Sequence, residues 1–268
     1  MAISKSALIG ENVVIREGVI IEDDVVIGDN CFIDYNAIIK SGARIESNSF
    51  IGANCIIGEY LGDFFDSFEV KSHPVFIGKN AVIRSQTVIY GDCVIGDYFT
   101  TGHKVTIREK TKIGEHVSIG TLSDIQGDCV IGNYTRLHSN VHIGMKTVLK
   151  DFVWVFPYVV FTNDPTPPST VLAGSTVERF AVVSTGSVIL PGLTIGENAL
   201  IGAGATVTKD APPHSIIVGT PGKNVGNVEK IRNADGKQVY PWHDTFSRAM
   251  PWAEIGYEKW NAQQQMKE

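Results

Sequence analysis

Residues 136–144, with the sequence RLHSNVHIG, contain two histidines four positions apart. An imidazole side chain titrates near neutral pH, so His138 or His142 could take a proton from a reacting group. Asp124 precedes His142 in the chain, and a carboxylate beside an imidazole fixes its tautomer and raises its basicity. Arg108 could pair with a phosphate. If the fold brings these residues together, they indicate acid–base chemistry on a charged substrate.

A period of six residues indicates the fold that must position them. Aliphatic residues recur at this spacing with one polar exception, Thr101, and in the first block the residue two positions before each of them is small. Six residues suit a short strand and a turn, and three such repeats close one coil. The pattern therefore predicts an all-β fold, a parallel β-helix of about ten coils. The repeated positions run through three blocks, residues 9–57, 77–161 and 177–207.

Two stretches interrupt the period and are predicted to be loops, residues 59–75 and 162–176. Long loops on a rigid scaffold often carry function. The repeat ends near residue 220, so we divide the chain into a β-helix domain, residues 1–220, and a C-terminal tail, residues 221–268. The tail has a helix-like run from Trp252, and we expect it to cap the open end of the coils.

Turns that lie three repeats apart stack along one edge of such a coil. One edge keeps ordinary Gly-x-x turns, whereas the two others depart from that form, as in HSN at 138–140 and REK at 108–110. Asp124 and His142 are also three repeats apart. The face between the two departing edges carries them as stacked outward neighbours, about 5 Å apart at the backbone. We predict that this face is functional.

Two small turns offer a different kind of site. Residues 184–186 (STG) and 202–204 (GAG) are three repeats apart and would stack. Small side chains there would let a narrow ligand approach the backbone amides. Lys209 and Lys223 follow these turns and could meet phosphate groups as point charges.

Composition limits the class of partner. The formal net charge is −6 and the chain has no run of Lys or Arg, so neither nucleic acid nor a membrane is expected as a partner. The first residues contain no apolar signal region, and we expect a soluble, cytoplasmic protein. The cysteines share one position of the repeat, which predicts burial in the core rather than a metal site, a disulfide or a nucleophile: Cys31, Cys55, Cys93 and Cys129.

The repeated pattern, aliphatic-Gly-x-x-small-x, resembles that of the hexapeptide-repeat acyltransferases over roughly residues 7–220. The motifs TGHKVTIREKTKIGEHVSIGT, HSNVHIG, FTNDPTPPS, ILPGLTIG and IGAGATVTKDAPP are similar to those of nucleotide-sugar N-acyltransferases. The nearest likeness is to enzymes that acetylate dTDP-linked 3-amino-3,6-dideoxyhexoses, and the tail motif VYPW…FSRAMPW resembles the same branch more loosely.

This resemblance implies a left-handed β-helix and a homotrimer with CoA between two subunits. It implies the transfer of an acyl group, most often acetyl, from acyl-CoA to the amine of a nucleotide-linked sugar, as in lipopolysaccharide or S-layer glycan synthesis. It leaves open the identity of the sugar, the position of the amine at C3 or C4, and the length of the acyl group. No metal is implied.

Together with the unusual face, the resemblance suggests three groups of site residues. The catalytic residues would be His142, Asp124 and His138. The acceptor would be bound by His103, Arg108, Glu109, Tyr90, Asn140 and Asn163. The CoA would lie along Ser184, Thr185, Gly202, Ala203, Lys209 and Lys223. No outward Cys and no Ser elbow is present, which favours direct attack by the amine over an acyl-enzyme. In some members of the family the departing thiolate is thought to take the proton, and His142 would then position the amine.

Two other functions remain open. Zinc-dependent carbonic anhydrases on the same scaffold hold the metal with three histidines between subunits, and His103, His138 and His142 resemble that set loosely. Metal ligands should occupy matching strand positions, however, whereas these three histidines fall in three different registers. A non-catalytic subunit of an assembly would have regular edges and no histidine cluster.

Overall fold

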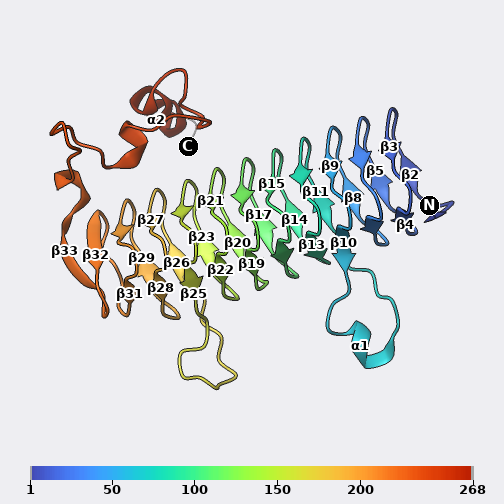
Figure 1. Ribbon diagram of the computed structural model, residues 1–268, viewed down its shortest axis with the longest axis horizontal. Helices are drawn as coiled ribbons and strands as arrows, with labels where there is room; N and C mark the ends of the chain where they lie inside the picture. Colours follow the sequence, from blue (N-terminus) through green and yellow to red (C-terminus); the bar gives the residue numbers. More distant parts are fainter. Residues whose placement is uncertain (1, 267–268) are drawn as a thin grey trace.

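The computed structural model describes residues 2–266 and consists of three parallel sheets that the chain visits in turn (Figure 1). Sheet A has 11 strands, sheet B has ten and sheet C has 12. Strands pair with the equivalent strand of the next coil, as in Asp124↔His142. The chain therefore forms the parallel β-helix that the period predicts.

Most strands are only two residues long, because each coil turns after every sixth residue. Sheet A contains β1 (Ala2–Ile3), β4 (Ile20–Ile21), β7 (Ile38–Ile39), β10 (Ile56–Glu59), β13 (Val88–Tyr90), β16 (Thr106–Ile107), β19 (Asp124–Ile125), β22 (His142–Ile143), β25 (Val160–Phe161), β28 (Val188–Ile189) and β31 (Thr206–Val207). Sheet B contains β2 (Leu8–Ile9), β5 (Val26–Ile27), β8 (Arg44–Ile45), β11 (Phe76–Ile77), β14 (Val94–Ile95), β17 (Lys112–Ile113), β20 (Val130–Ile131), β23 (Val148–Leu149), β26 (Thr176–Val177) and β29 (Thr194–Ile195).

Sheet C contains β3 (Val14–Ile15), β6 (Phe32–Ile33), β9 (Phe50–Ile51), β12 (Val82–Ile83), β15 (Thr100–Thr101), β18 (Ser118–Ile119), β21 (Arg136–Leu137), β24 (Trp154–Val155), β27 (Val182–Val183), β30 (Leu200–Ile201), β32 (Ser215–Val218) and β33 (Lys223–Asn227). The turns from a C strand to an A strand form the C–A corner, and those from an A strand to a B strand form the A–B corner.

The second residue of almost every strand points into the prism and is buried. Ile89, Ile107, Ile125 and Ile143 are all 0 % exposed and stack behind sheet A. All four cysteines are free and buried in this core, as predicted. Burial raises the pKa of Cys55 to about 11, which keeps its thiol protonated and unreactive.

The two interruptions of the period are loops that project from the same side of the β-helix (Figure 1). Both connect a strand of sheet A to a strand of sheet B, so both leave from the A–B corner. The first is shorter than expected at its start, because β10 extends to Glu59, and it contains a short helix, α1 (Phe64–Ser67). The second lies between β25 and β26.

The tail leaves the last coil through β33, which pairs antiparallel with β32. It then folds back along the outside of the coils (Figure 1) through two short 3-10 helices, η1 (Val228–Lys230) and η2 (Trp242–Asp244), to α2 (Tyr257–Gln265). The helix begins at Tyr257, later than Trp252, where the sequence placed the start of the helix-like run.

The tail packs on a ladder of aromatic rings at the corner between sheets B and C. Rings from successive coils lie parallel, with 4.4 Å between the centroids of Tyr98 and His116 and 4.6 Å between those of His116 and Tyr134. Phe152 continues the ladder, and Trp252 packs against it at 5.1 Å. The turns of Tyr98, His116 and Tyr134 at this corner keep the ordinary Gly-x-x form, so nothing in the sequence indicated that the corner would hold the tail.

The predicted number of coils, about ten, is too small, because the solenoid has about 12 turns. The first coil begins at Ala2, ahead of the first counted position, and β32 continues sheet C beyond Val207. The left-handed coil and the division at residue 220 stay predictions. Within residues 2–266, no helix is both long enough and apolar enough to span a membrane.

We expect Trp252→Ala to release the tail while the β-helix stays folded. Trp252 is 1 % exposed, and truncation of a buried Trp costs about 3–5 kcal/mol. Limited proteolysis should then cut within the tail far faster than in the parent protein, with an unchanged far-ultraviolet spectrum from the strands. Phe68→Ala is the control, since its ring is 74 % exposed on the first loop. Equal cleavage of both variants would mean that the ladder does not hold the tail.

Candidate functional site

The centre of the site is an aspartate–histidine pair on the outward face of sheet A. Asp124 begins β19 and His142 begins β22, and the two strands pair in register. His142 Nδ1 lies 3.1 Å from Asp124 Oδ2, and the two side chains are 41 % and 36 % exposed. Gln126 Nε2 donates a hydrogen bond of 2.6 Å to the same carboxylate oxygen. The predicted stacking is confirmed, and both side chains are partly exposed to solvent.

The contact with His142 lowers the pKa of Asp124, and the Gln126 hydrogen bond and the charge of Arg108 act in the same direction against the opposing effect of burial. The carboxylate is therefore charged at neutral pH and lies beside Nδ1 of His142. The other ring nitrogen, Nε2, is not in contact with Asp124. This arrangement can accept a proton from a group placed outside sheet A.

His138 and Asn140 lie in the C–A corner turn that leads into β22. Asn140 has a φ of 59°, the left-handed conformation of the repeat's turns. His138 stacks on Phe156, with 4.7 Å between ring centroids. Burial and the nearby Arg136 charge lower the pKa of His138, so its ring is neutral at pH 7. A Cβ on Gly120 would lie 2.4 Å from the backbone carbon of His138, so only glycine fits beneath this turn.

The three histidines considered for zinc have separate partners. His103 Nδ1 lies 2.8 Å from Ser85 Oγ in the C–A corner, whereas His138 stacks on an aromatic ring and His142 contacts a carboxylate. No group of three or more His, Cys, Asp or Glu side chains within residues 2–266 could hold a metal ion.

Three predicted acceptor-binding residues, Tyr90, Arg108 and Glu109, lie near the A–B corner of sheet A. The Arg108 guanidinium makes two hydrogen bonds to Glu109, of 2.8 and 3.0 Å, and its Cζ lies 5.8 Å from the centre of the Tyr90 ring. Because Glu109 already balances the charge of Arg108, this arginine is better suited to hydroxyl groups than to a diphosphate.

Asn163 follows β25 at the A–B corner. Its carbonyl accepts a hydrogen bond of 2.8 Å from the Ala173 amide, which closes the base of the second loop. A Cβ on Gly144 would lie 3.2 Å from the Asn163 Cβ, so Asn163 stands next to the turn after His142. The structure thus places Asn163 at the border of the sheet that carries the central pair.

The predicted CoA residues lie further along the β-helix. The turns of Thr185 and Ala203 stack at the C–A corner, where the Gly204 amide donates a hydrogen bond of 2.9 Å to the Thr185 carbonyl. The side chains of Thr185 and Ala203 are exposed. Ser184 and Gly202 precede them in the same two turns. Lys209 follows β31, and Lys223 begins β33. The amide of Gly222, the residue before Lys223, donates a hydrogen bond of 2.7 Å to the Thr206 carbonyl of β31. Lys209 and Lys223 are both exposed.

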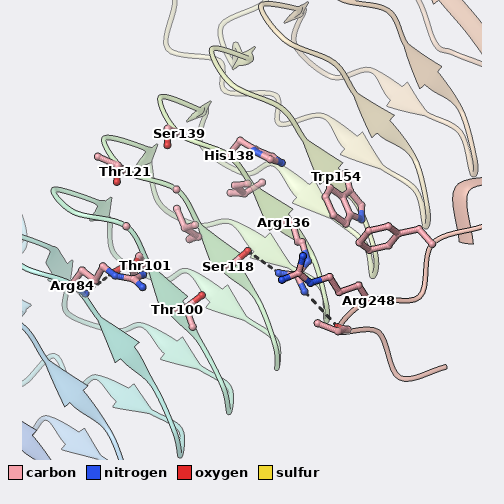
Figure 2. Close-up of a pocket in the computed structure, with 16 residues that line it drawn as sticks. Arg84, Thr100, Thr101, Ser118, Thr121, Arg136, His138, Ser139, Trp154 and Arg248 are labelled. Carbon is pink, nitrogen blue, oxygen red and sulfur yellow. Dashed lines mark hydrogen bonds between the residues drawn. The ribbon is translucent and has the colours of Figure 1, made fainter. Parts of the chain in front are cut away.

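A groove on the outward face of sheet C was missed by the sequence analysis. It has a volume of about 630 Å³ and is bordered by residues of the tail (Figure 2). Its cations are Arg84, Arg136 and Arg248, and Trp154 forms part of its wall. The available signal was the pair Arg136 and Trp154, which stand three repeats apart at outward strand positions. Arg248 lies outside the repeat, and no periodicity could have placed it.

Two family models match parts of the chain. The bacterial transferase hexapeptide model (six repeats) matches residues 24–59 and 110–144, and the second of these segments contains Asp124, His138 and His142. The model of the hexapeptide repeat of succinyl-transferase matches residues 3–35, 185–209 and 192–220. Segments at the start, middle and end of the β-helix therefore match models of hexapeptide repeats.

Similar proteins include acetyltransferases. A segment of 55 residues is 46 % identical to the serine acetyltransferase of Bacillus pumilus, covering 20 % of this chain and 25 % of that protein. A segment of 47 residues is 51 % identical to a predicted acetyltransferase of Schizosaccharomyces pombe, covering 18 % and 23 %. The chain thus matches about a quarter of the length of these curated relatives.

Among solved structures, the chain is similar to the UDP-N-acetylglucosamine acyltransferase of Bacteroides fragilis, with 24 % identity, a TM-score of 0.43 and coverage of 84 % and 72 % of the two chains. It is also similar to a maltose O-acetyltransferase of Clostridium difficile, with 21 % identity, a TM-score of 0.29 and coverage of 57 % and 69 %.

We expect the His138 ring to titrate below the ordinary imidazole value of about 6.5. Its pKa is lowered by burial in the folded protein, so the unfolded chain binds the proton first and His138 makes stability fall as the pH drops below that ordinary value. A proton NMR titration, assigned by loss of the signal in His138→Gln, measures this directly. A midpoint at or above that ordinary value would contradict the half-buried, neutral ring.

Proposed function

We propose that this protein is an N-acyltransferase that moves an acyl group, acetyl in the simplest case, from acyl-CoA to the amine of a nucleotide-linked amino-deoxy sugar. The observation that supports this function best is the Asp124–His142 pair on an outward face of the β-helix, in which His142 Nδ1 lies 3.1 Å from Asp124 Oδ2. That segment retains the repeat of the transferase superfamily while its outward positions carry acid–base groups.

The proposed step is direct attack of the sugar amine on the thioester carbonyl. His142 Nε2 takes a proton from the amine as the nitrogen–carbon bond forms, and Asp124 stabilises the imidazolium. The carbon–sulfur bond then breaks, and the proton passes to the departing CoA thiolate. If the thiolate takes the proton directly, His142 orients the amine instead. The four cysteines take no part, because each is buried in the core.

The remaining residues of sheet A would hold the acceptor. His138 and Asn140 border the His142 strand at the C–A corner, and Asn163 borders it at the A–B corner. On the coils before Asp124, the same face offers an aromatic ring and a balanced ion pair to a sugar, through Tyr90, Arg108 and Glu109. His103 would contribute from the C–A corner. A dTDP-linked 3-amino sugar is the acceptor that the motif resemblance favours.

The acyl-CoA would lie along the small turns at Ser184, Thr185, Gly202 and Ala203, with Lys209 and Lys223 near its phosphates. Exposed backbone amides at such turns can also stabilise the oxyanion of the tetrahedral intermediate. A second copy of the chain would cover these turns, because a single outward face leaves one side of the thioester open to water. We propose the homotrimer that the motif resemblance implies.

A thiol-release assay tests the activity. The purified protein is given acetyl-CoA and, in separate reactions, dTDP- and UDP-linked sugars with an amine at C3 or C4. Turnover that requires the amine, with no turnover on the matching hydroxy sugars, supports the proposal. Absence of turnover on every amino sugar, with longer acyl-CoA donors also inactive, contradicts it.

We expect His142→Asn to lower kcat by roughly 10²–10⁴-fold, the usual contribution of a general base. The acid limb of the pH–rate profile should flatten, since that limb reports protonation of the base. If His142 only orients the amine, KM should rise while kcat stays nearly intact.

The control for this variant is His214→Asn. His214 also contacts a carboxylate, with Nδ1 3.3 Å from Glu229 Oε1, but it lies near the end of the β-helix and away from sheet A. We expect its kinetics to match the parent protein. Parental kinetics in His142→Asn as well would remove the central pair from the mechanism.

We expect Ala203→Trp to abolish acyl-CoA binding, because the indole would fill the space above the small turns. Ala53→Trp is the matched control, since Ala53 occupies the same place in the C–A corner turn of an early coil. Equilibrium dialysis measures binding, and sedimentation checks that both variants keep the proposed trimer. Equal affinity in the two variants would rule out this position for CoA.

A further inference from the structure

The groove on sheet C has an unusual charge for this chain. The protein has a formal net charge of −6, yet the residues that line the groove include three arginines and no Asp or Glu. Within residues 2–266, no carboxylate oxygen lies within 4.0 Å of the guanidinium groups of Arg84, Arg136 or Arg248. These cations therefore have no ionic partner within the described chain.

Arg84 is held in place by a change in the strand ladder. In the regular ladder the residue after each inward aliphatic donates its amide to a carbonyl in the next coil, as Gly102 does to Ile119. Here the Arg84 amide donates to the Thr101 hydroxyl at 2.9 Å, and the Thr101 carbonyl accepts the Arg84 guanidinium at 2.6 Å. Thr101, the one polar residue of the inward series, thus fixes the direction of this arginine.

Arg136 is fixed between sheet C and the tail. Its guanidinium donates to the Ser118 hydroxyl at 3.4 Å and to the Ala249 carbonyl at 3.5 Å (Figure 2). It is half-buried, and burial lowers its pKa. A partly buried cation without a counter-ion costs free energy, which an anion in the groove would recover.

Aromatic surfaces lie beside these cations. Trp154 stands one coil after Arg136, whose Cζ lies 5.7 Å from the centre of the Trp154 ring. Phe246 of the tail packs edge-on against Trp154 at 5.3 Å, and His138 lines the end of the groove at the C–A corner. The groove thus joins arginines suited to phosphate with flat rings suited to a nucleobase.

We propose that this groove binds a nucleoside diphosphate ester, with its phosphates at Arg84, Arg136 and Arg248 and its base against Trp154 and Phe246. The inference rests on the proposed function, because a sugar nucleotide and CoA are both esters of this kind. The groove is also within reach of the proposed base. His138 lines the groove and His142 follows four residues later, so the two backbones are at most about 14 Å apart.

Calorimetric binding without turnover tests this assignment. The parent protein, Arg84→Gln, Arg248→Gln and the control Arg44→Gln are titrated separately with dTDP, with CoA and with inorganic pyrophosphate. Arg44 is the control because it is an exposed arginine at the outward position of β8 on sheet B. Each groove variant should weaken dTDP or CoA by about tenfold or more, the contribution of one charge-assisted hydrogen bond, and Arg44→Gln should not.

The probes distinguish the two sources of the diphosphate. Weakened binding of dTDP alone assigns the groove to the acceptor, weakened binding of CoA alone assigns it to the donor, and loss of both means that the two share it. The assignment is overturned if the parent binds neither dTDP nor CoA, or if both groove variants bind them as the parent does.

Sedimentation of the same variants provides the remaining outcome. A groove variant that dissociates into smaller species while the Arg44 variant does not would make these arginines a contact between subunits, and would overturn the assignment. The thiol-release assay is independent of this result. If the groove variants lose binding and the parent protein has no acyl-transfer activity, the nucleotide site is retained and the proposed acyl transfer is rejected. If the parent is active and the groove variants bind dTDP and CoA normally, acyl transfer is retained and the nucleotide site is rejected.

Discussion

The structure depends on the hydrogen-bond ladder between coils, which fixes each residue above its equivalent in the preceding coil. Because the ladder is parallel and in register, inward residues such as Ile125 and Ile143 stack on one another and exclude water. The outward residues are then free to vary without loss of the core. A chain built in this way can change one face at a time, which is how Asp124 and His142 come to be neighbours.

The outward faces of sheets A and C use this register in different ways. On sheet A, acidic and basic groups balance one another, as in Asp124 with His142 and Arg108 with Glu109. The result is a polar face with a free imidazole nitrogen and little excess charge. On sheet C, the arginines lack such partners within the described chain, so the field in the groove is positive although the chain as a whole is acidic. The contrast separates a face suited to proton transfer from a groove suited to an anion.

The tail connects these features through contacts that the ladder cannot supply. Trp252 packs on Phe152 in the aromatic ladder, and this contact returns the chain to the middle coils. The segment that precedes it then lies beside sheet C, where the Ala249 carbonyl accepts a hydrogen bond from Arg136. The groove has a wall on this side only because the tail folds back, so the stability of the ladder and the shape of the groove are linked.

The sequence by itself determined the coil, the buried cysteines and the register of His142 over Asp124, because all of these follow from a period in which neighbours are a constant number of residues apart. It also contained the aromatic ladder, at positions such as Tyr98 and Tyr134, although nothing local showed that a tail would dock there. Only the tertiary structure decided that Arg248 lies beside sheet C and that Glu109 neutralises Arg108. The path of the tail depends on packing between parts of the chain with no common period, and a side-chain ion pair depends on rotamers, so neither follows from spacing.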